Sequence, residues 1–388
     1  MRTRSFNRRV PLLNMSLSQQ EDSCAASWLE QADEAREENS ARNALHQHIA
    51  RHWQTPWAAS FMGGRAALFA VIRTLGLQPG DRIVVPAFTC QCVANAITFN
   101  GIEISFADIE INTFGMSARA LKQAITPRTR AVLIQYSFGL VCRDIEQLIA
   151  VARENHLWVI EDCAHATGGK WQGQLLGRLG DIAFFSSERS KIVNTIHGGW
   201  VITANPQLGE RLMMVYDQAP EADNLFITAL LQTLRAAYGE LHNRPFSPAV
   251  ALIPQMQPAE LAGMFTPQYS WRMAEPVAEL LLLQLEKLDT FVQKRVEGAS
   301  FWQDWASRQG IEPLLSREGA QNTWLRYPVM LSASQKTQRR ELEELLNIEI
   351  GVWFTTPVHP QPLTLPDCPV GMAAARCCVN LPTWLWDD

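Results

Sequence analysis

The chain has 388 residues, of which 47% are hydrophobic and 19% are charged, and its formal net charge is -5. This composition is typical of a globular protein with a large core and two or three structural units. The charge provides no general attraction to nucleic acid, and no apolar run approaches the roughly 18 residues that span a bilayer. The eight cysteines form no CxxC pair, so we expect reduced thiols, a cytoplasmic location and no metal site.

The N-terminus is predicted to form a basic tail followed by a helix. Four arginines lie within the first nine residues, and no apolar stretch of signal-peptide length follows them. The sequence from about Asp33 to Trp53 is polar and rich in Ala, Glu and Arg, which favours a helix packed on the outside of the main body. We therefore assign residues 1–44 to a tail and helix.

A large domain is predicted over residues 45–268. Helical patterns cover 64–75 and 145–154, and short apolar runs predict strands at 82–85, 102–106, 131–134, 157–160, 182–185 and 200–203. Strands that are apolar on both faces and separated by helices indicate an α/β fold, in which a mainly parallel sheet has helices on both faces. Ligands of such sheets gather at the carboxyl ends of the strands.

A helical insert is expected within this domain at about 217–267. Apolar residues recur at helical spacing from Asn224 to Leu241, and prolines then interrupt an irregular connection. Residues 269–388 are predicted to form a smaller C-terminal α+β domain. It would contain a long helix at about 276–297 and strands at 325–331 and 351–354.

The candidate catalytic residues follow two of the predicted strands. Lys191 comes after the run 182–185, and Asp162 ends the run that begins at 157. A lysine amine can form a Schiff base with the aldehyde of pyridoxal phosphate, and a carboxylate can keep the pyridine nitrogen protonated. Each residue also has an ordinary interpretation, because surface lysines are common and a strand-end carboxylate often caps a helix.

The sequence also contains candidates for a phosphate site. Gly64, Arg65 and Ala66 begin a predicted helix, where unpaired backbone amides and the helix dipole favour an anion. Ser186 could add a hydroxyl, and the guanidinium of Arg65 is a strong phosphate partner. His165 could hydrogen-bond the phenolic oxygen of the cofactor, stack near its ring, or be a partly buried structural histidine.

Taken together, these residues resemble the DegT/DnrJ/EryC1/StrS family of fold-type I pyridoxal phosphate enzymes, over about residues 45–385. The matching motifs occur in the family's order, at 84–89, 160–165, 180–191, 198–199, 271–273 and 283–289. The resemblance implies a fold-type I transferase with pyridoxal 5'-phosphate bound to Lys191 and the pyridine nitrogen beside Asp162. It also implies that Ser186 and the amides of Arg65 and Ala66 hold the phosphate, with His165 near the phenolic oxygen.

The activity that the resemblance implies is a transamination. The family moves an amino group, commonly from glutamate, to a keto group on a nucleotide-linked sugar for polysaccharide or secondary-metabolite biosynthesis. The lysine, once freed, moves a proton between the substrate and the cofactor. Members are homodimers with their sites at the subunit interface.

Four positions depart from the family pattern. Cys90 stands where an aromatic residue often stacks on the cofactor, so Phe88 or another side chain would have to cover the ring. Ser270 stands where an asparagine reaches the partner's phosphate, Arg65 replaces a threonine, and His197 replaces an acidic residue. A non-catalytic or regulatory binding protein derived from the family therefore remains an alternative.

A lyase or dehydratase is a further possibility on the same scaffold. The family's dehydratase branch carries a histidine in place of the lysine, so Lys191 argues against this activity.

Overall fold

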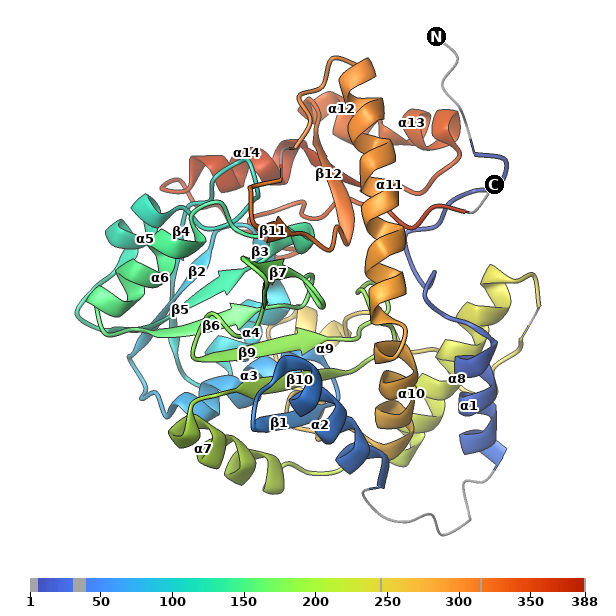
Figure 1. Cartoon of the computed structure of the whole chain (residues 1–388), viewed down its shortest axis with the longest axis horizontal. Coiled ribbons are helices and arrows are strands. Elements are labelled where there is room, and N and C mark those ends of the chain that lie inside the picture. The colour runs from blue at the N-terminus through green and yellow to red at the C-terminus, as the bar shows by residue number, and fades with distance from the viewer. Residues whose placement is uncertain (1–5, 31–39, 245, 315, 387–388) are drawn as a thin grey trace.

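A computed structural model describes residues 6–30, 40–244, 246–314 and 316–386 (Figure 1). Its main sheet consists of β1 (Trp57–Phe61), β2 (Arg82–Pro86), β4 (Glu103–Ala107), β5 (Thr129–Gln135), β6 (Trp158–Asp162), β9 (Ile182–Ser186) and β10 (Gly199–Thr203). The spatial order is β1-β10-β9-β6-β5-β2-β4. The five strands from β9 to β4 are parallel, whereas β10 and β1 are antiparallel at one edge. The mainly parallel sheet is confirmed.

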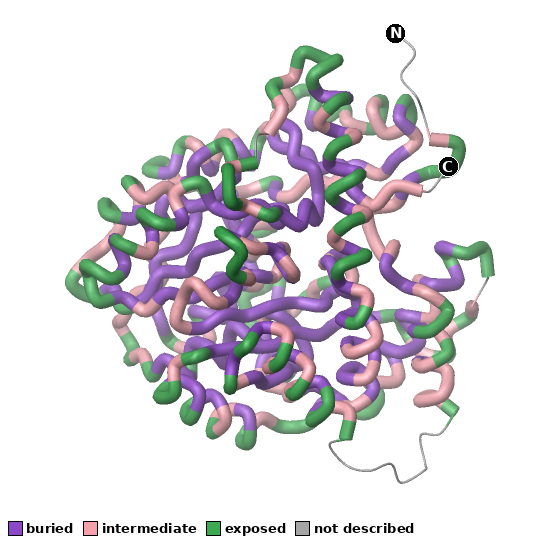
Figure 2. Tube along the Cα trace, in the orientation of Figure 1, coloured by how far each residue is buried: buried purple, intermediate pink, exposed green. Residues whose placement is uncertain are grey.

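Helices cover both faces of this sheet because its strands are apolar on both sides. In β2, Val84 enters one apolar cluster while Ile83 and Val85 enter the other. The helices of the first cluster include α2 (Ser40–Trp53), α5 (Ala118–Ala124), α6 (Ile145–Glu154) and α10 (Glu275–Leu285). Those of the second are α3 (Gly64–Leu75), α4 (Gln91–Thr98) and α7 (Pro206–Asp217). Figure 2 shows the resulting layer of buried strands.

The C-terminal part of the chain forms a third apolar cluster. It surrounds the antiparallel pair β12 (Arg326–Met330) and β14 (Cys378–Pro382) and includes the buried Trp302. Its helices are α11 (Leu288–Arg308), α12 (Ala333–Thr337), α13 (Arg339–Leu346) and α14 (Pro369–Cys377). The boundary predicted at residues 268 and 269 stays a prediction.

Two small sheets connect this part to the main body. In one, β3 (Thr89–Cys90) pairs in parallel with β13 (Val358–His359). In the other, β7 (Lys170–Trp171) lies between β8 (Gln174–Leu175) and β11 (Ala320–Gln321). The remaining elements are α1 (Gln19–Glu30), α8 (Asn224–Leu241), α9 (Pro258–Leu261) and the 3-10 helices Ser137–Gly139 and Pro267–Tyr269.

Most predicted elements are confirmed, and two are wrong. The predicted helices at 64–75, 145–154 and 224–241 coincide with α3, α6 and α8. The single helix expected at 276–297 is instead two helices, because α10 packs on the main sheet while α11 turns toward the C-terminal cluster. The strand expected at 351–354 is absent: Gly351 makes an isolated bridge to Asn380, and Trp353 and Phe354 line a cavity.

Residues 6–17 form an N-terminal strap along the C-terminal part of the chain. Val10 forms a bridge with Ile348, and Arg326 donates a hydrogen bond to the carbonyl oxygen of Leu12. Asn194 Nδ2 donates to Asn14 Oδ1 at 3.0 Å. The described part of the predicted tail is therefore packed against the body and leads into α1, which contacts α8 and α10. Residues 1–5 and the beginning of the predicted helix at 33–39 lie outside the described residues.

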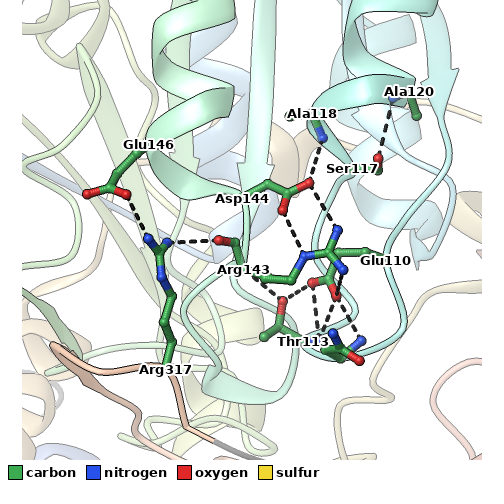
Figure 3. A network of polar contacts seen from close by, with 10 residues as sticks. Glu110, Thr113, Ser117, Ala118, Ala120, Arg143, Asp144, Glu146 and Arg317 are labelled. Atoms are coloured by element: carbon green, nitrogen blue, oxygen red, sulfur yellow. Dashed lines mark hydrogen bonds and ion pairs between the residues drawn. The ribbon is translucent and has the colours of Figure 1, made fainter.

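A polar network joins α6 to the loops around it (Figure 3). Asp144 Oδ2 accepts a hydrogen bond from the amide of Ala118 at 3.0 Å, and Asp144 Oδ1 lies 2.8 Å from Arg143 Nε. Arg317 donates to the carbonyl oxygen of Arg143 at 2.8 Å and pairs with Glu146 at 2.7 Å. Because Arg317 and Glu146 are solvent-accessible, their ion pair contributes about 0–1 kcal/mol, and the network mainly orients the loops.

Within the described residues, no helix is long and apolar enough to cross a membrane.

Glu161 anchors the loop that leads into β9. Its side chain is fully buried, and one carboxylate oxygen accepts hydrogen bonds from the amides of Leu179 at 2.7 Å and Gly180 at 2.6 Å. The other oxygen accepts from Tyr136 Oη at 2.7 Å and the amide of Gly177 at 2.9 Å. The four donors offset part of the cost of burying this carboxylate, and burial still raises the pKa of Glu161.

We predict that Glu161→Gln lowers the free energy of unfolding by about 2–4 kcal/mol, because an amide NH₂ cannot accept two of these four hydrogen bonds. Urea denaturation of the wild type and the variant measures the change. The exposed Glu154 on α6 provides a matched control, and Glu154→Gln should change stability by less than about 0.5 kcal/mol. Equal stability of Glu161→Gln and the wild type would contradict the anchoring role.

Candidate active site

A cavity of about 420 Å³ lies at the carboxyl edge of the parallel strands. The ends of β6 and β9, the beginning of α3 and the turn after β9 form one side of it, and loops near residues 255–261 and 353–360 form the other. Six of the nine predicted site residues line the cavity: Gly64, Arg65, Asp162, His165, Ser186 and Lys191. Ala66, Phe88 and Ser270 do not.

Lys191 lies in the turn that follows β9, and its side chain is half-buried. The amide of Lys191 donates to the carbonyl oxygen of Glu188 at 2.8 Å, which closes the turn. The amine Nζ lies 5.0 Å from the centre of the Trp353 ring. The turn therefore presents a primary amine to the cavity beside an aromatic face.

Asp162 is the last residue of β6 and is buried in the cavity wall. Its Oδ1 accepts a hydrogen bond from the amide of Ala164 at 3.0 Å. Burial raises the pKa of Asp162 to about 6, while the Ala164 amide and the charge of Lys191 act in the opposite direction. A buried carboxylate with this incomplete compensation suits a cationic ring nitrogen as a further partner.

His165 has its tautomer set by the backbone. Its Nδ1 accepts a hydrogen bond from the amide of Phe138 at 3.2 Å, so the ring proton resides on Nε2. Burial and the charges of Lys191 and Arg326 hold the pKa of His165 well below its usual value. The neutral ring stacks on Trp353 at 5.0 Å and 13°. His165 can thus donate one hydrogen bond through Nε2.

The beginning of α3 and the end of β9 form a cradle that suits a phosphate. No side chain caps the helix at Gly63, so the amides of its first turn, at Gly64, Arg65 and Ala66, have no partner within the helix. A Cβ on Gly64 would lie 2.7 Å from the Cβ of Ser186 and 3.0 Å from its Oγ. Only glycine permits this close approach. Ala66 itself is fully buried, so its amide is the only group it can provide.

The guanidinium of Arg65 is already paired. It forms an ion pair with Glu260, and its Nη2 donates to the carbonyl oxygen of Gln255 at 2.8 Å. Glu260 is only 1% exposed and also accepts a hydrogen bond from Tyr269 Oη at 2.6 Å. The positive charge expected at the phosphate site is therefore neutralised by the insert.

The same insert provides cavity-lining residues that the sequence did not reveal, namely Gln255, Met256 and Leu261. The short helix α9 is held against α4, where Asn95 Nδ2 donates to the carbonyl oxygen of Glu260 at 2.9 Å. Gln91 Nε2 donates to that of Leu261 at 3.0 Å. Trp353 was also missed. Proline-rich spacing near 245–267 marked an irregular connection, but no local signal placed it at the cavity.

Phe88 and Ser270 both lie outside the cavity, and for Phe88 the predicted contact with the cofactor needs correction. Phe88 is fully buried among Phe114, Phe138 and Phe354, with ring centres 5.7, 6.2 and 5.0 Å away, so it does not face the cavity. Trp353 lies there instead. Ser270 donates to the carbonyl oxygen of Pro267 at 2.9 Å and lines a separate small hollow. Its proposed contact with a second subunit stays a prediction.

His197, the fourth departure from the family pattern, lines the cavity and is almost completely buried. Phe226 of α8 packs edge-on against its ring at 5.9 Å. Burial and the charges of Arg65 and Arg189 hold the pKa of His197 well below its usual value. A neutral histidine thus replaces an acidic residue beside the glycine pair.

Comparison with known proteins gives consistent results. The model of the DegT/DnrJ/EryC1/StrS aminotransferase family matches residues 18–385. The GDP-perosamine synthase of Caulobacter vibrioides is 27% identical over 82% of this chain and 78% of its own length. The L-glutamine:2-deoxy-scyllo-inosose aminotransferase of Micromonospora echinospora is 30% identical over 66% and 54%. A structure assigned as a sugar aminotransferase of Streptococcus pneumoniae, in its PLP form, has a TM-score of 0.74 at 20% identity, covering 95% and 91%.

The raised pKa of Asp162 predicts a pH dependence of the cofactor-free protein. Because the folded-state pKa exceeds the usual value, the folded state binds the additional proton and loses stability as the pH rises from about 3.8 to about 6. Asp162→Asn does not titrate. Its stability relative to the wild type should therefore increase across this range, by up to about 3 kcal/mol, and then remain constant.

Urea denaturation at several pH values measures this difference. Asp217→Asn, at the exposed end of α7, is the control and should keep a constant offset from the wild type. If the difference in stability between Asp162→Asn and the wild type is also independent of pH, burial does not destabilise the Asp162 carboxylate.

Proposed function

The chain belongs to the DegT/DnrJ/EryC1/StrS aminotransferase family, and from this premise we propose that it uses pyridoxal 5'-phosphate to transfer an amino group to a keto sugar carried on a nucleotide. The observation that carries the proposal is the meeting of Lys191 and Asp162 in one cavity, at the ends of neighbouring strands. The uncapped first turn of α3 and Ser186 provide a phosphate cradle in the same cavity.

The residues of the cavity fit this cofactor in three respects. The amine of Lys191 is available for its aldehyde, and the carboxylate of Asp162 for its ring nitrogen. The Nε2 proton of His165 is available for its phenolic oxygen, since Nδ1 is occupied by the Phe138 amide. The glycine at 64 leaves room where any side chain would meet Ser186.

Pyridoxal phosphate, when bound, supplies an electron sink that makes the α-hydrogen of an amino acid acidic. The residues of this chain would control the proton and the charge. Asp162 would provide a negative charge beside the ring nitrogen and so keep that nitrogen protonated. Lys191 Nζ would take the proton from the α-carbon of the amino donor and deliver it to the aldehyde carbon of the cofactor. The Trp353 ring lies beside the amine, with its centre 5.0 Å from Nζ.

The sequence suggests glutamate as the amino donor, and the relatives broaden the choice. One relative is named for L-glutamine as donor and an inosose as acceptor, whereas others are named for GDP-perosamine and a UDP-linked 3-dehydro-glucosamine derivative. We retain a nucleotide-linked keto sugar as the acceptor. A spore coat polysaccharide biosynthesis protein of Bacillus subtilis is 29% identical over 76% of this chain, in keeping with a role in polysaccharide synthesis.

A homodimer and a cytoplasmic location complete the proposal. Leu261, Met264 and Phe265 are 45–56% exposed beside the cavity, and an exposed apolar group of this kind suits a contact with a second copy. The cysteines are in the thiol form, as expected in a reducing compartment.

A non-catalytic binding protein is the alternative function. The pairing of Arg65 with Glu260 removes one phosphate ligand and is the observation in its favour. Turnover separates the two: an enzyme converts bound pyridoxal phosphate to the amine form when glutamate or glutamine is added, and a binding protein does not.

We predict that Lys191→Ala abolishes covalent capture of the cofactor and lowers the rate of amino-donor conversion by about 10²–10⁴-fold or more, because the base and the covalent anchor are lost together. Borohydride reduction followed by peptide mass spectrometry locates the pyridoxyl label, and absorbance spectroscopy follows the conversion. Lys122→Ala, at an exposed position of α5, should behave like the wild type. A label on another lysine would refute the assignment of Lys191.

We also predict that Gly64→Ala weakens binding of pyridoxal phosphate by about tenfold or more, which is about 1.4 kcal/mol, because the new methyl group meets Ser186 in the phosphate cradle. Binding of pyridoxal, which lacks the phosphate, should be almost unchanged. Fluorescence titration with both ligands gives the ratio of the two dissociation constants. Ser186→Ala adds no bulk and should shift the ratio in the same direction; an equal loss for both ligands would place the phosphate elsewhere.

A further inference from the structure

Two cysteines lie together in the wall of the cavity. Cys90 ends β3 and directly precedes α4, and Cys92 lies in the first turn of that helix. Their sulfur atoms are 3.4 Å apart, and both side chains are half-buried and line the cavity. The transamination proposed above requires neither thiol, so this pair is unexplained by that function.

The surroundings of the pair favour a thiolate on Cys90. The hydrogen bond shared with Cys92 lowers the pKa of the Cys90 thiol to about 7, and desolvation opposes this effect. The backbone amide of Cys92 and the positive charges of Lys191 and Arg65 lower it further. The Cys90 thiolate raises the pKa of Cys92 in turn, and burial adds to this effect. Cys90 is thus the better nucleophile, and Cys92 stays protonated in contact with it.

We propose that Cys90 and Cys92 form a dithiol that hydroperoxides convert reversibly to a disulfide, which makes the cavity wall a site of oxidative modification. The inference depends on the geometry of the two sulfur atoms and is independent of the proposed cofactor. The sulfur atoms need to approach from 3.4 Å to about 2.05 Å, the length of a disulfide bond. Cys90 is the last residue of β3 and Cys92 the second residue of α4, so we expect rotation of the two side chains to provide most of this movement.

The reaction balances with one hydroperoxide for each pair. The Cys90 thiolate attacks the terminal peroxide oxygen, the O–O bond breaks, and a sulfenic acid forms on Cys90 as water or an alcohol leaves. The Cys92 sulfur, after losing its proton, then attacks the Cys90 sulfur, and hydroxide leaves with that proton as water. The two thiols lose two electrons and the peroxide gains them. A dithiol reductant reverses the change.

The sequence permits a direct test. Cleavage after Arg82 and Arg119 releases residues 83–119 as one peptide, in which Cys90 and Cys92 are the only cysteines. After treatment of the folded full chain with hydrogen peroxide, we expect this peptide to lose the mass of two hydrogens and to regain it after reduction with dithiothreitol. If both thiols of this peptide stay reduced while Cys377 in the same protein is oxidised, the proposal is overturned.

Single variants separate the roles of the two sulfurs. Cys92→Ser removes the resolving thiol, so Cys90 should accumulate a sulfenic acid that dimedone traps. Cys90→Ser removes the thiolate, so the remaining Cys92 should react about tenfold or more slowly than Cys90 does. Cys377→Ser is the matched control at another half-buried cysteine and should leave disulfide formation unchanged. Cys92 reacting as fast as Cys90 would refute the assigned roles, and thermal unfolding of each variant confirms that it is folded.

Discussion

The site depends on the alternation of side chains at the end of β6. Two adjacent carboxylates there point to opposite faces of the sheet, so one meets four donors and the other meets the cavity. Glu161 fixes the loop that enters β9, and β9 in turn places Ser186 and the turn of Lys191. Asp162 is left with little compensation. Glu161 therefore holds the surrounding loop and β9 in place, while the neighbouring carboxylate of Asp162 stays buried with few hydrogen-bond partners. A cofactor site requires an incompletely solvated carboxylate of this kind.

The helical insert explains why several departures from the family pattern occur together. Glu260 pairs with Arg65, Phe226 packs on His197, and the main chain of residues 253–255 accepts hydrogen bonds from Arg189 and Arg65. Two of the four replaced side chains, Arg65 and His197, are therefore matched by a contact from the insert. An arginine in the phosphate turn would be an unpaired buried charge without Glu260, and Glu260 would be one without the arginine. The substitutions are best understood as one unit.

The sequence was sufficient for the parts of the site that lie on parallel strands, because their carboxyl ends converge at one edge whatever the connections between them. Lys191, Asp162 and Ser186 could be placed in this way, whereas Gly64 was placed by the predicted beginning of a helix. Phe88 could not, since strand alternation does not distinguish a ring packed in the core from one that faces a cavity. Trp353 and residues 255–261 reach the cavity through contacts with segments far away in the sequence, such as the contact of Arg65 with Glu260. A local sequence pattern does not predict contacts of this kind. The break between α10 and α11 was missed for the same reason.

The N-terminal strap has a consequence for the order in which the molecule assembles. Phe6 and Val10 bond to residues 346–348, Arg8 lies 3.8 Å from the centre of the Trp386 ring, and Asn14 holds Asn194 close to Lys191. Most of these contacts join the strap to segments that lie far away in the sequence and are synthesised much later. The strap therefore cannot dock until the C-terminal strands have emerged, and the turn that carries Lys191 receives its last support only then. The emerging chain is expected to keep an unfinished site until residues 346–386 have been synthesised and folded.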